Sequence, residues 1–289
     1  MIDFYSFIED NPTFKQFKVD ELLFMAYDCP IEVSPLDYFV EKNYFCYVFK
    51  GGAKWRTQTD EYTLKVGDAA FLKKGAHKVY KILNGDFCAL IIFIPDQFIS
   101  SVVKSELSSI PTSQKSITTD SIIPLEVDPT LSDYFSTVLN YFSQTNAPSK
   151  SLLNIKFKEL IINIVTSNRN QSLTEYFREI AYSNKESLEV IMEENFSYNL
   201  KLKDFAKLSG RSLASFNRDF AKTYGTTPGR WLKLKRLEYS RLLLETTSLN
   251  INQITLESGF ENTSHFIRTF KSHFNHSPLR FKKIKEGSL

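Results

Sequence analysis

The first part of the chain alternates short β-rich runs with turn signals. Six such runs follow one another between Phe39 and Pro95, at residues 44–50, 53–59, 62–65, 69–72, 77–83 and 86–94. Gly51-Gly52 and Asn84-Gly85 separate two pairs of runs, and Asn-Gly between strands is a strong signal for a tight hairpin. Short strands spaced this closely predict a small antiparallel barrel or sandwich.

The middle of the chain changes to helical spacing. Residues 100–124 are rich in Ser and Thr and include two prolines, so we expect mostly loop there. Apolar residues then recur at intervals of three and four over 131–144 and again over 152–165. These segments predict a helical hairpin that packs on the barrel or, alternatively, forms the surface of a homodimer.

From Ser187 onward the pattern is helical throughout and contains an internal repeat. Residues 216–220 align with 266–270 at an offset of 50, each reading Phe-x-Arg-x-Phe, and 227–230 align with 277–280. Identical Phe, Arg, Pro and second Arg positions at one offset are unlikely by chance. One structural unit is therefore expected to occur twice.

Each copy of the repeat has the pattern of a helix-turn-helix motif. A short apolar helix stops at Ser-Gly, residues 209–210 or 258–259, and Ser212 or Asn262 then provides an N-cap for a second helix. The side chains expected to be buried by the second helices are Leu213, Phe216, Phe220 and Tyr224 in the first copy, and Phe266, Ile267, Phe270 and Phe274 in the second.

The opposite face of each second helix is expected to point outward. Placing residues at about 100° intervals puts Arg218 and Arg268 on this face in register. The same construction adds Arg211, Ala214, Ser215 and Lys222 in the first copy, and Glu261, Ser264, His265 and Ser272 in the second. A solvated helix face is the alternative, but two copies with matched arginines favour a helix that reads bases in the major groove.

A long helical segment, residues 228–246, connects the copies. A stiff connecting helix would let one chain reach two major-groove segments of double-stranded DNA one turn, roughly 34 Å, apart. Lys282, Lys283 and Lys285 near the C-terminus suit contacts to phosphates, which position a protein without specifying sequence.

Charge is distributed unevenly along the chain. Residues 200–289 carry 17 Lys and Arg against 7 Asp and Glu, a net charge of +10, whereas the remaining 199 residues carry a net charge of −7. A basic end on an acidic body fits a polyanionic partner for the C-terminal region alone.

These motifs resemble the AraC/XylS family of bacterial transcription regulators. The family's second-motif signature is similar to Gly259-Phe260-x-x-x-Ser264-x-Phe266-x-Arg268-x-Phe270-Lys271 and its continuation to Lys282, although Asn275 stands where the family commonly has glycine. The resemblance implies base-reading roles for Ala214, Asn217 and Arg218, and for Thr263, Ser264 and Arg268. It also implies recruitment of RNA polymerase, and hence activation.

The complete set of expected DNA-binding residues combines the outward faces, the caps and the resemblance. It is Arg211, Ser212, Ala214, Ser215, Asn217, Arg218, Asn262, Thr263, Ser264, His265, Arg268 and Lys271.

The N-terminal region resembles a cupin-like regulatory domain, in particular that of an ExsA-like subgroup. The resemblance rests on Gly67-Asp68-x-x-Phe71-Leu72-x-x-Gly75-x-His77 and on the strand pattern. The expected signal is either a small molecule in the barrel or a regulatory protein, and we favour the small molecule. An effector pocket would be lined by Phe45, Tyr47, Trp55, Phe71, His77 and Tyr80.

The sequence argues against an enzyme, a cofactor or a metal. His77 stands alone where metal-dependent cupins have the last of several ligands, and no nucleophile, phosphate-loop or zinc-protease motif occurs. Cys29, Cys46 and Cys88 are unclustered and predict buried, reduced thiols. Neither a signal sequence nor a membrane span is evident, so we expect no membrane partner and a cytoplasmic location.

We therefore expect an α+β protein that is a sequence-specific transcription regulator. Residues 1–170 would form a cupin-like β-barrel with a helical hairpin for regulation or dimerisation, 171–186 a linker, and 187–289 an all-α domain with two helix-turn-helix motifs joined by a long helix. The alternatives are a cupin-type enzyme fused to a nucleic-acid anchor and a non-specific nucleic-acid binder.

Overall fold

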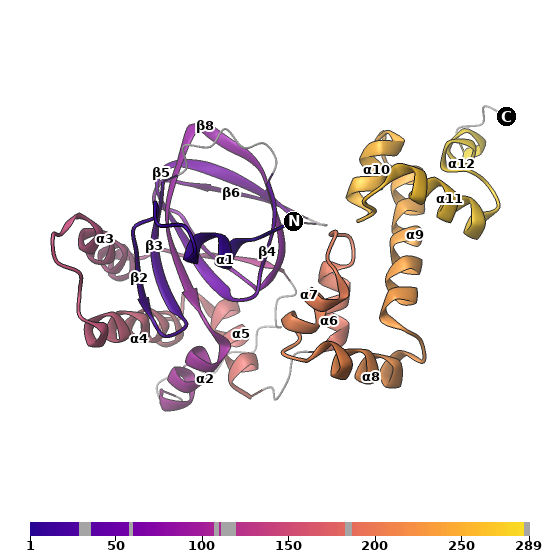
Figure 1. Cartoon of the computed structure of the whole chain (residues 1–289). Helices are drawn as coiled ribbons and strands as arrows, with labels where there is room; N and C mark the ends of the chain where they lie inside the picture. The colour runs from indigo at the N-terminus through magenta and orange to yellow at the C-terminus, as the bar shows by residue number, and fades with distance from the viewer. Residues whose placement is uncertain (29–35, 58–59, 107–109, 111–119, 183–186, 286–289) are drawn as a thin grey trace. The chain divides into compact units, whose positions relative to one another are not determined.

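A computed structural model describes residues 1–28, 36–57, 60–106, 110, 120–182 and 187–285. The chain divides into two compact units, Ile2–Asn184 and Lys185–Leu289, the latter grouped with Met1 (Figure 1). Curved sheet in the first unit and helices in the second confirm the predicted α+β fold class.

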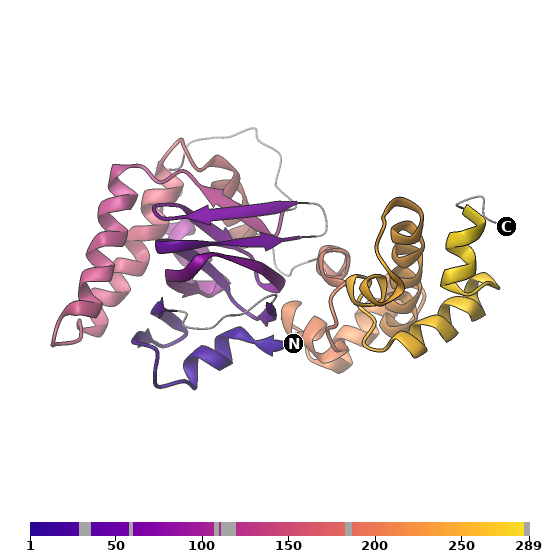
Figure 2. The ribbon, with the colours of Figure 1, turned by 90° about the horizontal axis from the view of Figure 1, so that it is seen from above.

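The first unit is built on one strongly curved sheet, shown from two directions in Figures 1 and 2. Its two longest strands, β5 (Asn43–Arg56) and β8 (Gly75–Ile94), pair antiparallel along most of their lengths. The other strands in the described residues are β1 (Ile2–Asp3), β2 (Gln16–Val19), β3 (Leu22–Asp28), β4 (Leu36–Val40), β6 (Glu61–Lys65), β7 (Ala69–Leu72) and β9 (Ile122–Leu125).

The hairpin expected at Asn84-Gly85 and the turn expected at Gly51-Gly52 do not form. Each pair lies inside one long strand, because Gly51 pairs with Phe87 and Gly52 with Leu83, so the register skips residues 84–86. Gly51 has φ +66°, a left-handed conformation that a glycine adopts without strain. A β-bulge uses the same residue types as a tight turn and increases the local twist, which curls the sheet instead of reversing the chain.

The predicted helical hairpin is confirmed as α3 (Pro129–Ser143) and α4 (Lys150–Thr166), which lie together against one face of the sheet (Figures 1 and 2). The Tyr47 ring stacks on Phe135 of α3, with centroids 4.3 Å apart, and the Phe24 ring stacks on Phe157 of α4. Of the two alternatives left open for this hairpin, packing on the sheet is therefore observed. A role in dimerisation stays a prediction.

Two segments expected to be irregular are partly helical. The segment 171–186, expected to be a linker, contains α5 (Gln171–Tyr182), and the expected loop at 100–124 contains the end of α2 (Asp96–Ser105) and β9. Phe177 of α5 is fully buried and contacts Phe45 and Phe71 of the sheet. The sequence did not predict these helices because the polar residues on their solvent side obscure the apolar spacing of the side that packs on the sheet.

A further short helix, α1 (Phe4–Glu9), covers another part of the sheet.

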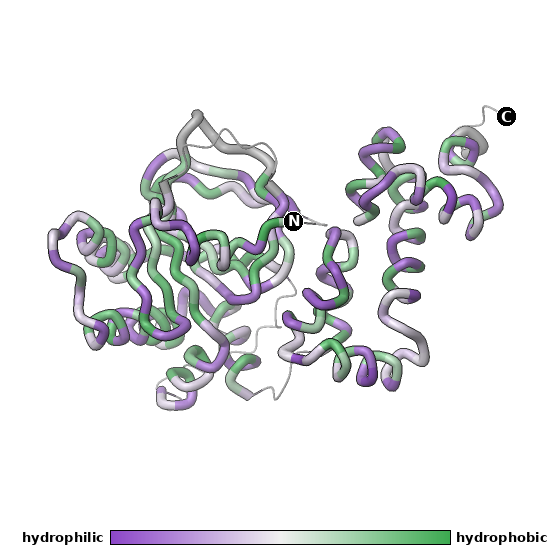
Figure 3. The backbone as a smooth tube through the Cα atoms, viewed as in Figure 1, coloured by the Kyte–Doolittle hydropathy of each residue, from purple (hydrophilic) through white to green (hydrophobic). Residues whose placement is uncertain are grey.

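In the described residues of the second unit every regular element is a helix. Its elements are α6 (Leu188–Asn195), α7 (Leu202–Leu208), α8 (Leu213–Tyr224), α9 (Pro228–Thr246), α10 (Ile251–Glu257), α11 (Thr263–Phe274) and α12 (Pro278–Lys285). Apolar and polar residues alternate along these helices, whereas the central strands of the first unit are apolar over long stretches (Figure 3). The predicted pair of helix-turn-helix motifs joined by a long helix is confirmed as α7–α8, α9 and α10–α11.

Candidate nucleic-acid interface

The two turns are built in the same way. Gly210 and Gly259 have φ +63° and +81°, and the N–H after each glycine donates across the turn, Arg211 to the Ala206 carbonyl at 2.9 Å and Phe260 to the Thr255 carbonyl at 3.0 Å. This pattern satisfies carbonyls at a helix end and reverses the chain within a few residues. The second turn is one residue longer, because Glu261 precedes its N-cap.

The predicted N-caps are confirmed. The Ser212 hydroxyl oxygen accepts a hydrogen bond from the Ser215 N–H at 3.2 Å, and Asn262 Oδ1 accepts one from the His265 N–H at 3.0 Å. Both second helices end on a left-handed residue, Gly225 and Asn275, each with φ near +62°. Asn275 can therefore take the place of the glycine that is usual in the family, because asparagine tolerates the left-handed conformation.

The apolar faces agree with the prediction except at two positions. Phe216, Phe220, Phe266 and Phe270 are fully buried, but Leu213 is 44% exposed and Ile267 is 36% exposed. Leu213 is the first residue of α8, and Ile267 lies about 100° around α11 from Phe266, so both sit at the margin of the buried stripe.

Most of the predicted DNA-binding residues lie on the exposed faces of α8 and α11. The exposed members are Ser212, Ala214, Asn217, Arg218, Asn262, Ser264, His265, Arg268 and Lys271, while Arg211, Ser215 and Thr263 are half-buried. The side chains of Ser212 and Asn262 are used as caps, and the Thr263 hydroxyl donates to Asn252 Oδ1. The arginines in register, Arg218 and Arg268, are both accessible.

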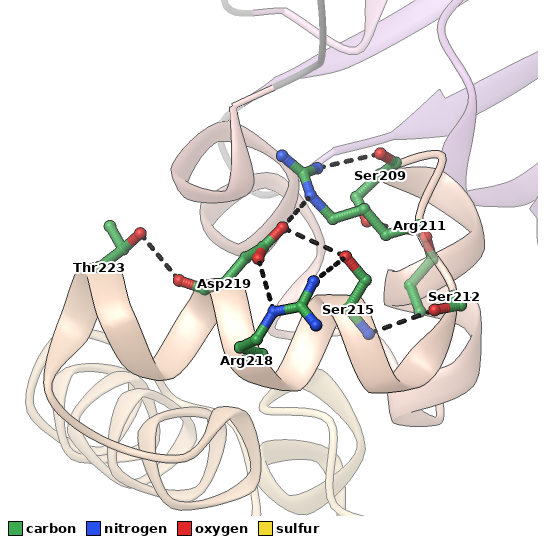
Figure 4. A network of polar contacts seen from close by, with 8 residues as sticks. Ser209, Arg211, Ser212, Ser215, Arg218, Asp219 and Thr223 are labelled. Carbon is green, nitrogen blue, oxygen red and sulfur yellow. Dashed lines mark hydrogen bonds and ion pairs between the residues drawn. The ribbon is translucent and has the colours of Figure 1, made fainter.

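Asp219 organises the outward face of the first motif, a role that the sequence reasoning missed (Figure 4). Asp219 Oδ2 lies 3.3 Å from Arg211 Nε and accepts a hydrogen bond from the Ser215 hydroxyl, while Asp219 Oδ1 lies 3.7 Å from Arg218 Nε. Arg211 also donates to the Ser209 carbonyl, and its side chain is only 10% exposed, against 76% for Arg218. Arg211 therefore braces the turn, whereas Arg218 projects from the helix.

The second motif has a different polar arrangement. Thr269 occupies the position that matches Asp219, and its hydroxyl donates to the His265 carbonyl in its own helix. Within the described part of the chain Arg268 has no ion-pair partner. The difference between the two copies at this position, Asp219 against Thr269, next to the matched arginines, is the sequence signal that could have drawn attention to Asp219.

Of the C-terminal lysines, only Lys282 can be placed. Its ammonium donates to the Leu249 carbonyl at 3.0 Å, which holds the middle of α12 against the loop before α10. The side chains of Lys283 and Lys285 lie outside the described residues. Phosphate contacts by these lysines stay a prediction.

The residues expected to line an effector pocket divide between the two faces of the sheet, and effector binding stays a prediction. Phe45, Tyr47 and Phe71 belong to the core between the sheet and its helices, whereas Trp55 belongs to the core on the other face of the sheet. Regular alternation would put Phe45 and Trp55 on one face, but the register shift between Val48 and Lys50 adds one unpaired residue to β5 and reverses the alternation. The side chain of Tyr80 lies outside the described residues.

His77 lies with Trp55 rather than with the phenylalanines. Its ring stacks on Tyr38, whose hydroxyl accepts a hydrogen bond from Trp55 Nε1 at 3.1 Å, and its Nε2 donates to the Lys73 carbonyl at 2.7 Å. Burial lowers the pKa of His77 to about 4, although the hydrogen bond to Lys73 opposes this shift. The imidazole is therefore neutral at physiological pH.

Other predicted chemistry can be checked only in part. No group of three or more metal-ligating side chains occurs among the described residues. Cys46 and Cys88 are buried free thiols, as predicted, and burial raises the pKa of Cys46, while Cys29 lies outside the described residues. In the described ranges, none of the helices has the length and apolar character needed to cross a membrane.

Two helix-turn-helix motifs with exposed arginines, following a curved β-sheet unit, define a DNA-binding transcription regulator with a separate N-terminal domain. Comparison with known families agrees: residues 43–176 match the ExsA N-terminal regulatory domain and residues 205–284 match a helix-turn-helix domain. The chain belongs to the AraC/XylS family of transcription regulators.

Two sequence relatives that are matched over most of their length support this assignment. The chain is 26% identical to the virulence regulon transcriptional activator VirF of Yersinia enterocolitica, over 82% of this chain and 88% of VirF. It is 24% identical to the transcriptional regulator ExsA of Pseudomonas aeruginosa, over 89% of this chain and 92% of ExsA. Among solved structures, ToxT from Vibrio cholerae matches 93% of this chain and 100% of ToxT at 15% identity, with a TM-score of 0.37.

Proposed function

We propose that this regulator activates transcription by placing α8 and α11 in two adjacent major-groove segments of its operator. The observation that carries the proposal is the matched exposure of Arg218 and Arg268 on two equivalent helices. The connecting helix α9 has 19 residues, so its length is about 28 Å, comparable with the roughly 34 Å of one DNA turn.

Base recognition is assigned to a small set of exposed side chains. Arg218 and Arg268 suit bidentate hydrogen bonds to guanine, Asn217 suits adenine, and Ser264 can pair with several bases. Ala214 offers only an apolar contact, such as one with a thymine methyl group. Arg211 is better suited to positioning, because its guanidinium is already held by Asp219 and the Ser209 carbonyl.

The N-terminal unit is proposed to control this activity. Its match to a regulatory domain supports a role in receiving a signal or in dimerisation, and contact with RNA polymerase is inferred from relatives named as activators. Since the expected pocket residues divide between two packed cores, a protein partner acting on the surface fits better than a small molecule inside the sheet. The described residues hold no cluster of metal-ligating side chains that would support the alternative of a metal-dependent cupin enzyme.

The test is a binding experiment with the full chain. Binding sites selected by the chain from a random-sequence duplex pool are expected to bind at least a thousandfold more tightly than scrambled duplexes at physiological salt. Affinity should fall steeply as salt is raised. Equal affinity for selected and scrambled duplexes would overturn the proposal and favour a non-specific nucleic-acid binder.

A further inference from the structure

A buried arginine in the connecting helix holds a loop that is distant in sequence. Arg236 lies midway along α9, and its Nε and Nη2 atoms donate to the carbonyls of Phe196 and Tyr198, each at 2.7 Å. These carbonyls belong to the loop between α6 and α7, which we call the 196–198 loop. A planar guanidinium fork matches two fixed acceptors better than any other side chain does.

The turn of the second motif is pressed against the same contact. A Cβ atom added to Gly259 would lie 2.8 Å from the Ser197 carbonyl oxygen and 2.9 Å from Arg236 Nε, closer than atoms can approach without displacement. Gly259 is therefore needed both for its positive φ and for this approach. The 196–198 loop, the middle of α9 and the turn between α10 and α11 meet at one point.

The first motif has no such contact at its own turn. A Cβ atom added to Gly210 would meet no atom within 4 Å in the described structure. The 196–198 loop, however, leads directly into α7, which begins at Leu202 and is the first helix of the first motif. The Arg236 contact therefore connects the entry of the first motif to the turn of the second.

We propose that Arg236 is a positioning residue that fixes the separation and angle of the two reading helices, so that the protein recognises two half-sites only at one spacing. This inference rests on the proposed function. Burial lowers the pKa of Arg236 to about 10, which still leaves it charged at neutral pH, and the nearby Glu261 carboxylate favours that charge. Without the guanidinium, two carbonyls lose their hydrogen bonds and the second turn loses its support.

The experiment compares tolerance to half-site spacing. Two duplexes are prepared: the one selected by the unmodified chain, and the same duplex with one base pair inserted between the half-sites. The insertion rotates one half-site by about 34° relative to the other. The unmodified chain is expected to bind the inserted duplex at least tenfold more weakly. For Arg236→Met we expect about tenfold weaker binding to the selected duplex, and a penalty for the insertion of threefold or less.

Arg241→Met is the matched control. Arg241 lies on the same helix and is half-exposed. It pairs with Glu238 and lies over the Phe274 ring of α11, whereas the hydrogen bonds to Phe196 and Tyr198 come from Arg236, so loss of Arg241 should leave the insertion penalty unchanged. Arg236→Lys keeps the positive charge but lacks the planar guanidinium that donates to two carbonyls, so its insertion penalty should be intermediate. If Arg236→Met does not fold by circular dichroism, Arg236→Lys and Gly259→Ala provide the same comparison.

The outcomes separate this inference from the proposed function. A folded Arg236 variant that keeps the full insertion penalty would overturn the positioning role and leave sequence-specific binding intact. A chain that does not distinguish selected from scrambled duplexes would overturn the proposed function itself. A penalty that shrinks in the Arg236 variants but not in Arg241→Met would support the inference.

Discussion

The guanidinium of Arg211 lies 3.3 Å from the carboxylate of Asp219, and this contact joins the turn of the first motif to the middle of its second helix. At the corresponding place in the second turn, Phe260 is buried and packs on Phe266, with ring centroids 5.1 Å apart. The two copies therefore stabilise the same turn by different means, an ion pair in one and an aromatic contact in the other.

Replacing Asp219 with asparagine should loosen the first motif alone. The variant removes the partner of Arg211 and one contact of Arg218, and we expect a loss of about 1 kcal/mol in local stability, because the pair is only partly buried. Hydrogen exchange of peptides covering residues 202–224 measures the local stability of the first motif. Thr269→Val is the matched control in the second motif, and equal deprotection of both motifs in Asp219→Asn would contradict the assignment.

Arg218→Ala and Arg268→Ala should each weaken operator binding by about 1–3 kcal/mol and relax base preference at one position. The physical reason is the loss of a bidentate contact to a base edge. Fluorescence anisotropy on duplexes with single base changes in each half-site measures both effects. Lys222→Ala is expected to weaken binding evenly across sequences, and a similarly even effect for the two arginines would argue against base reading.

Gly259→Ala should destabilise the second unit more than Gly210→Ala. Both positions have positive φ, which costs a residue with a Cβ about 1–2 kcal/mol. Only at Gly259 does the added Cβ meet the Ser197 carbonyl and Arg236, so the loss there should be larger by at least a further 1 kcal/mol. Urea unfolding of the two variants measures the difference, and equal losses would show that the Cβ is accommodated.

His77 should make the first unit less stable in mild acid. The pKa of His77 is about 4 in the folded chain and about 6.5 when unfolded, so between these values the unfolded chain binds an extra proton and stability falls as the pH falls. The loss can reach about 3 kcal/mol near pH 4 and is absent above pH 6.5.

The measurement uses a background in which Trp55 is the only fluorescent indole. The chain has two tryptophans, so Trp231→Phe leaves Trp55 to report on the first unit. Urea unfolding of this protein is compared with the same protein carrying His77→Gln, which can still donate to the Lys73 carbonyl. The two stability curves should converge as the pH falls from 6.5 to 4, and parallel curves would contradict the prediction.

Local pattern was sufficient for the DNA-binding half of the molecule. The caps at Ser212 and Asn262, the turn glycines, the buried phenylalanines and the exposed arginines all depend on residues within a few positions of one another. Helix and turn propensities act over this range, and a repeat doubles the signal. For the same reason the double motif and most of its outward face could be predicted from the printed sequence.

Contacts between distant residues required the folded chain. Gly51-Gly52 and Asn84-Gly85 carry the signals of turns, and only the pairing of β5 with β8 makes them an irregularity inside two long strands. The same pairing leaves one residue of β5 unpaired between Val48 and Lys50, which places Trp55 and Phe45 on opposite faces. Arg236 and the 196–198 loop are about 40 residues apart, and no periodicity links them. A side chain's local sequence indicates which element it occupies, whereas its partner depends on how those elements pack.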